Sequence, residues 1–140
     1  MMTTEQNKPI KKGNNNNNQG NETNFVMTQV VNVSGTRFEM IDETWQKIKQ
    51  NVPHEFQGQL YDSGKEVYVE RHAAAFQCIL YYNQGGELHL PNGLCPSTFQ
   101  REIDFWGVKT TSLAKCCFAK YMSYLDDQNT LQVYINNFLP

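Results

Sequence analysis

The run VVNVSGTRFEMI, residues 30–41, decides the fold, because it places strand-forming side chains on both sides of a Ser-Gly pair. Such a pair between β-branched and aromatic residues is typical of two antiparallel strands joined by a tight turn. A second hairpin is expected in residues 59–69, where apolar side chains flank Asp62-Ser63-Gly64. The two hairpins predict a small sheet at the start of the domain.

Downstream of the hairpins the apolar spacing becomes helical. Residues 73–82 repeat apolar side chains at i, i+3 and i+4, and Gly85-Gly86 follows them. Residues 97–106 repeat them at i, i+4 and i+7, behind a predicted capping box of Ser97 and Gln100. Both segments are expected to be helices with a buried face.

Two further helices are expected. One begins at Asp42, which can cap it, and ends before Pro53. The other covers residues 113–122. Hairpins followed by helices predict an α/β domain, with a small mixed sheet packed against several helices, and argue against a doubly wound sheet.

Length and composition predict one folded domain with appended segments. The 140 residues carry 12 Lys+Arg against 14 Asp+Glu, a balance that argues against nucleic-acid binding. The expected organisation is a disordered Asn-rich tail at 1–27, a domain at 28–124 and a linker or tail at 125–140. Apolar stretches are too short to cross a bilayer and the amino-terminal stretch is polar, so a cytoplasmic location without membrane insertion is expected.

The cysteines have an unusual spacing together with one histidine. His89, Cys95, Cys116 and Cys117 form an H-x5-C-x20-C-C pattern, and Zn²⁺ accepts this set of nitrogen and sulfur ligands. The spacing lacks the C-x2-C pair of a zinc finger. Spacing alone therefore leaves two interpretations, a zinc site or buried thiols that pack as small hydrophobic side chains. Cys78, inside a predicted core helix, is assigned to packing.

Enzyme chemistry is not supported by any local pattern. The sequence contains no G-x-S-x-G, P-loop, H-E-x-x-H or dinucleotide fingerprint. A thiol enzyme would need an activated cysteine, and no nucleophile signature surrounds the four cysteines. We expect no catalytic activity.

Six segments together resemble the cytoplasmic tetramerisation domain of voltage-gated potassium channels, which has a BTB/POZ-type fold. The hairpin is similar to the family's opening I/L-N-V-G/S-G-x-R-F/H-E run. The matching segments are Val31 to Glu39, Thr44, Glu66 to His72, Phe76 with Ile79 to Tyr82, Gly86 to His89, and Phe99 to Val108. The resemblance covers nearly the whole predicted domain.

The H-x5-C-x20-C-C pattern is similar to the zinc motif of the Shab, Shaw and Shal channel classes. By that resemblance His89, Cys116 and Cys117 of one subunit bind Zn²⁺ together with Cys95 of the neighbouring subunit. The zinc is then structural and clips adjacent subunits of a fourfold ring. This arrangement also accounts for a spacing that does not suit a single-chain finger.

The resemblance implies a function in selective subunit association, as a homotetramer or with related channel subunits. Four polar residues are nominated as subunit contacts: Arg37, Glu70, Arg71 and Asp104. As part of a channel complex the domain would lie at the cytoplasmic face of the plasma membrane. The sequence itself carries no pore or voltage sensor, so it is expected to be either the amino-terminal part of a channel or a free-standing assembly domain.

The main departures from the family pattern are Ala73 in place of Pro, Asn83-Gln84 in place of Arg-Thr, and residues 45–57, which lack the P-x-T-x-L segment. One alternative function stays open, a BTB-type adaptor that links a cullin ubiquitin ligase to its substrates. Such an adaptor would also oligomerise, often without zinc between its subunits.

Overall fold

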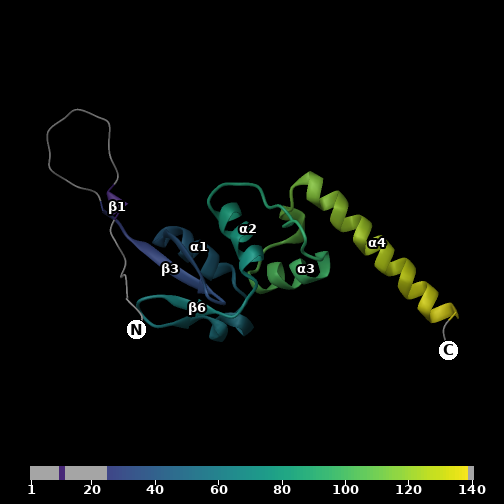
Figure 1. Cartoon of the computed structure of the whole chain (residues 1–140), viewed down its shortest axis with the longest axis horizontal. Coiled ribbons are helices and arrows are strands. Elements are labelled where there is room, and N and C mark those ends of the chain that lie inside the picture. Colours follow the sequence, from purple (N-terminus) through teal and green to yellow (C-terminus); the bar gives the residue numbers. More distant parts are fainter. Residues whose placement is uncertain (1–9, 12–24, 139–140) are drawn as a thin grey trace.

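A computed structural model describes residues 10–11 and 25–138 of the chain (Figure 1). Strand β1 (Ile10–Lys11) pairs antiparallel with β2 (Phe25–Val26). Most of the tail predicted to be disordered, residues 1–9 and 12–24, lies outside the described residues. The folded body begins at Thr28, in β3.

The first predicted hairpin is confirmed. Strand β3 (Thr28–Val33) pairs antiparallel with β4 (Thr36–Ile41) along its full length. Ser34 and Gly35 have φ angles of 50° and 101°, the left-handed conformation that a two-residue type I′ turn requires at both central positions. The right-handed twist of the paired strands favours this turn.

The second predicted hairpin is also confirmed, and it completes a mixed sheet. Strand β5 (Tyr61–Asp62) pairs antiparallel with β6 (Val67–Val69), and β6 pairs parallel with β3. The sheet order is β4-β3-β6-β5. The parallel pair joins the two hairpins, and the chain crosses between them through helix α1 (Asp42–Asn51) and the 3-10 helix η1 (His54–Gln59).

The remaining elements are α2 (Ala73–Asn83), α3 (Pro96–Phe105), the 3-10 helix η2 (Thr110–Ser112) and α4 (Lys115–Phe138). The core lies where the sheet meets α1, α2 and α3. Its largest fully buried side chains are Trp45, Trp106, Phe76, Phe99, Phe105, Ile48, Ile79, Leu88 and Ile103. This architecture confirms the predicted α/β fold with a small mixed sheet packed against several helices.

Two predicted helix caps are wrong. Asp42 lies inside the first turn of α1 and its N–H donates to the Met27 carbonyl, because the chain enters the helix directly from β4. Ser97 lies inside α3, where Pro96 takes the first turn and Cys95 is the N-cap. Proline suits the first helical position, because its missing N–H would have no partner within the helix.

Gly107 fixes the junction between α3 and α1. Its φ of 68° is left-handed, and a Cβ built on it would overlap the backbone carbonyl of Asn51. Glycine therefore permits both the turn after Trp106 and the close approach of the end of α1.

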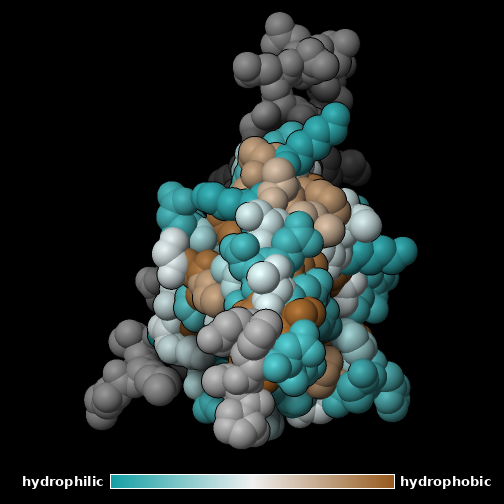
Figure 2. All heavy atoms as spheres, turned by 90° about the vertical axis from the view of Figure 1, so that its right-hand side faces the viewer, coloured by the Kyte–Doolittle hydropathy of each residue, from teal (hydrophilic) through white to brown (hydrophobic). Residues whose placement is uncertain are grey.

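Helix α4 extends well beyond the predicted residues 113–122. Tyr121 is buried against the body, whereas the described side chains of residues 126–137 are exposed. The helix therefore projects from the domain (Figure 1). The face of the molecule on the side where α4 lies carries both hydrophilic and apolar residues (Figure 2). In the described part of the chain, none of the helices combines the length and apolar character that crossing a membrane requires.

Candidate metal centre

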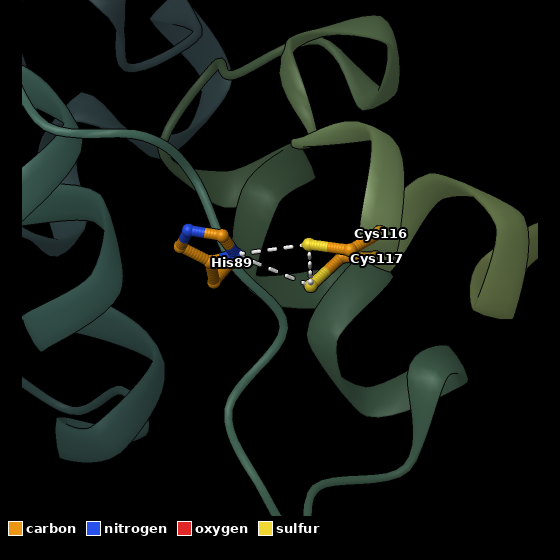
Figure 3. Close-up of side chains that lie close together, drawn as sticks. All are labelled: His89, Cys116 and Cys117. Atoms are coloured by element: carbon orange, nitrogen blue, oxygen red, sulfur yellow. Dashed lines mark hydrogen bonds between the residues drawn. The ribbon is translucent and has the colours of Figure 1, made fainter.

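Three of the four predicted zinc ligands come together where α4 begins (Figure 3). His89 lies on the extended segment between α2 and α3, while Cys116 and Cys117 lie in the first turn of α4. Leu88 forms a parallel bridge with Leu113, and the Ala114 N–H donates to the Leu88 carbonyl over 2.8 Å. These backbone contacts, together with the complete burial of Leu88, bring residues 27 positions apart into contact.

The spacing of the ligand atoms fits a tetrahedral zinc site. His89 Nδ1 lies 3.6 Å from Cys116 Sγ and 3.5 Å from Cys117 Sγ, and the two sulfurs are 4.0 Å apart. Zn–S bonds of about 2.3 Å and Zn–N bonds of about 2.0 Å at tetrahedral angles separate S and N by about 3.5 Å and two sulfurs by about 3.8 Å. The three side chains thus match three corners of such a site.

Hydrogen-bonding groups flank two of these three side chains. The Leu90 N–H donates to Cys117 Sγ over 3.3 Å. The second ring nitrogen of His89, Nε2, lies 3.2 Å from Glu87 Oε2. The motif itself did not identify Glu87, although its place two residues before His89 puts both side chains on one side of an extended segment.

Cys95 is not part of this cluster of described residues. It is exposed at the N-cap of α3, and its Sγ lies 3.5 Å from Ser97 Oγ. Hydrogen bonds from the Ser97 side chain and backbone lower the pKa of the Cys95 thiol. One chain therefore presents three clustered candidate ligands and a separate, exposed thiol whose pKa is lowered.

Cys78 differs from the other cysteines. It lies half-buried on α2 and packs against the core. Burial raises the pKa of its thiol, and the nearby charge of Cys117 adds to this effect. A neutral thiol in such a place is consistent with its assignment to packing.

Arg71, nominated as a subunit contact, is engaged within its own chain. Its guanidinium donates to both carboxylate oxygens of Glu102, over 3.2 and 2.8 Å. It also lies 4.5 Å from the centroid of the Phe105 ring. Because the Glu102 side chain is only 8% exposed, this pair ties the segment before α2 to α3.

The other three nominated residues are exposed. Arg37 Nε donates to Glu66 Oε2 over 3.0 Å. The Glu70 carboxylate lies 3.5 Å from the Tyr68 hydroxyl, and Asp104 accepts a 2.7 Å hydrogen bond from Gln100. Gln100 also accepts from the Thr110 and Tyr121 hydroxyls, so it links α3 to η2 and α4.

Comparison with known proteins places this fold in a family. The BTB/POZ domain matches residues 30–116. The chain is 32% identical to voltage-gated potassium channel KCNC4 of Homo sapiens over 71 residues, which is 51% of this chain and 11% of the channel. It is 28% identical over 123 residues to KCNC1 of Mus musculus, covering 83% of this chain and 24% of that channel.

A regulatory subunit is also similar. The voltage-gated potassium channel regulatory subunit KCNF1 of Rattus norvegicus is 43% identical over 58 residues, 41% of this chain and 12% of that protein. The chain therefore spans a quarter or less of the length of each of these relatives. These matches confirm the resemblance to voltage-gated potassium channel proteins, and the chain belongs to the BTB/POZ domain family.

Proposed function

We propose that the chain is the cytoplasmic tetramerisation domain of a voltage-gated potassium channel, and that it selects which subunits assemble. The BTB/POZ match and the similarity to channel proteins support this proposal. Tethering of attached segments by such a domain raises their effective concentration and so promotes assembly of the rest of the chain. The proposed location is the cytoplasmic face of the plasma membrane, and no catalytic step is assigned.

We further propose that a structural Zn²⁺ joins neighbouring subunits. The observation that carries this is an incomplete tetrahedron: His89, Cys116 and Cys117 match three corners, and Cys95 stands apart on the same chain. In a cyclic ring each subunit meets its neighbour through two different faces. Cys95 of one subunit can therefore complete the cluster of the next.

The energetic role of the metal follows from this division of ligands. Structural zinc sites supply on the order of 10 kcal/mol of binding free energy. Since the ligands come from two chains, that free energy stabilises the assembly as well as the fold. Four protein ligands close the site, so the ion would act as a structural link.

Polar contacts would add selectivity to this link. Arg37, Glu70 and Asp104 are exposed and form part of the proposed interface. Charges at such an interface discriminate between partners by penalising mismatched faces. Arg71 contributes to the interface by ordering the segment beside Glu70.

The first test measures mass by light scattering and zinc content, before and after a strong chelator. We expect a tetramer with about one zinc per chain that dissociates when the metal is removed. A metal-free oligomer would overturn the zinc link and favour the adaptor alternative, which binding to a cullin would then establish.

A complementation experiment tests the division of ligands. Cys95→Ala chains keep the three-ligand cluster, and Cys116→Ala/Cys117→Ala chains keep Cys95. Each variant alone should fail to assemble, whereas a 1:1 mixture should regain zinc at roughly one ion per two chains, because alternate interfaces are intact. Cys78→Ala serves as the matched control and should assemble normally. No recovery in the mixture would show that the ligands do not divide between chains in this way.

A further inference from the structure

We propose that Glu87 is a positioning residue of the metal centre, whose carboxylate holds the His89 ring with Nδ1 toward the two thiols. This inference rests on the proposed metal site and names a residue outside the four-ligand motif. The contact that carries it is the 3.2 Å distance between Glu87 Oε2 and His89 Nε2.

The local backbone explains why these two side chains meet. Glu87 and His89 flank Leu88 on an extended segment, so their side chains leave on the same side while Leu88 points the opposite way. Leu88 is completely buried and its backbone is bonded to Ala114. The buried leucine thus fixes the segment that carries both polar groups.

The two ring nitrogens of His89 have different partners. Nδ1 faces Cys116 and Cys117 at 3.6 and 3.5 Å (Figure 3). Nε2 lies 3.2 Å from the Glu87 carboxylate. A neutral imidazole binds a metal through the nitrogen that lacks a proton. A proton on Nε2, donated to Glu87, leaves the Nδ1 lone pair directed at the position that Zn²⁺ would occupy.

The carboxylate is expected to matter for metal binding more than for folding. The Glu87 and His89 side chains are 76% and 44% exposed, and exposed pairs contribute little to stability. Coordination withdraws electrons from the ring and strengthens the hydrogen bond that its N–H makes. Removal of an outer partner of this kind lowers metal affinity by about 10- to 100-fold.

The test compares Glu87→Ala and Glu87→Gln with the wild-type protein in zinc competition against a chromogenic chelator. Because the pair is exposed, we expect an affinity loss near the lower limit, about tenfold for Glu87→Ala, and a smaller loss for Glu87→Gln, which keeps an acceptor oxygen. Thermal unfolding of the metal-free variants should match wild type. Glu55→Ala, which removes an exposed carboxylate on η1, is the control and should bind zinc normally.

Long-range ¹H–¹⁵N spectra of the zinc-loaded protein give a second readout. We expect metal-bound Nδ1 and protonated Nε2 for His89, with faster exchange of the Nε2 proton in Glu87→Ala. Affinity in Glu87→Ala within about twofold of wild type, or zinc bound through Nε2, would overturn the proposed role of Glu87.

The outcomes separate this inference from the proposed function. Suppose that Glu87→Ala binds zinc more weakly, while the mass of the wild-type protein does not change on chelation. These two results together would support the positioning role of Glu87 and overturn the zinc link between subunits. If Glu87→Ala instead binds zinc as tightly as wild type, and the wild-type tetramer dissociates on chelation, the zinc link is supported and the positioning role of Glu87 is overturned. A wild-type protein that binds no zinc would overturn both.

Discussion

Replacement of Arg71 by methionine should destabilise the domain itself, because it leaves the Glu102 carboxylate buried without its cation. The two side chains are 22% and 8% exposed, and both guanidinium contacts with Glu102 lie within 3.2 Å. Methionine keeps much of the aliphatic length of arginine and removes the charge. The variant therefore tests whether Arg71 acts mainly within its own chain.

The expected magnitude follows from the burial of the pair. Removal of one partner from a buried ion pair costs about 3–5 kcal/mol. The lower value applies here, because Arg71 is partly exposed and Glu102 keeps a 3.4 Å contact with the His72 N–H. In a domain of this size, a loss of about 3 kcal/mol corresponds to a fall in Tm of roughly 12–24 °C.

The assay is thermal unfolding at two protein concentrations, which separates the stability of the chain from that of the assembly. Arg37→Met is the matched control for the stability of the single chain, although Arg37 also lies in the proposed interface: its pair with Glu66 is 53% and 30% exposed, and removal of this pair should cost the chain less than about 1 kcal/mol. Adding Glu102→Gln to Arg71→Met should recover part of the loss, since no buried charge then remains. A Tm for Arg71→Met equal to that of Arg37→Met, together with loss of the oligomer, would refute this reasoning and make Arg71 a subunit contact.

Three further predictions follow from the structure. Gly107→Ala should lower the free energy of unfolding, measured by denaturant titration, by about 3 kcal/mol, because alanine is strained at a left-handed φ and its Cβ would overlap the α1 backbone. A loss below about 1 kcal/mol would contradict the close approach of Gly107 to the end of α1. In metal-free protein, mass spectrometry should find Cys95 alkylated faster than Cys78, because the Cys95 pKa is lowered and the Cys78 pKa is raised. Zinc should protect Cys95, and equal rates with and without zinc would exclude it as the fourth ligand. The hydrogen bond from Arg37 lowers the pKa of Glu66 from its ordinary 4.5. The ionised Glu66 carboxylate therefore stabilises the fold above pH 4.5, and this contribution is lost as the pH falls through the lower pKa of the folded state. The acid-induced loss of stability, followed by circular dichroism, should therefore be shallower in Arg37→Met, and an unchanged profile would count against the pair.

Local patterns in the sequence predicted much of the fold, because the information lay within a few neighbouring residues. The Ser34-Gly35 turn needs two left-handed residues between strand formers, and that requirement is visible in the chain. The helical periods of α2 and α3 follow equally from side chains three and four positions apart. The two caps failed because both depended on how the chain enters a helix: from β4 at Asp42, and through Pro96 at Ser97.

The full length of α4 was harder to predict. Its second half carries few charges and an irregular apolar pattern, and its described side chains from 126 to 137 are exposed. A helical period of apolar residues indicates a helix face that is buried in the core. The part of α4 that projects from the domain has no such face, so the pattern is missing there. The domain boundary near residue 124 stays a prediction.

The sequence by itself determined the two hairpins, the buried faces of the helices and the identity of the nitrogen and sulfur ligands, since each depends on residue type and short-range spacing. Only the tertiary structure decided which ligands meet. His89 reaches Cys116 and Cys117 because a buried leucine and a backbone bridge join segments far apart in the chain, while Cys95 remains exposed at the start of α3. The contact of Glu87 with His89 is local, since the two residues lie two positions apart on an extended segment. The partner of Arg71, by contrast, was decided by the tertiary structure, because Glu102 lies 31 positions away and meets Arg71 only through packing, which residue spacing does not encode.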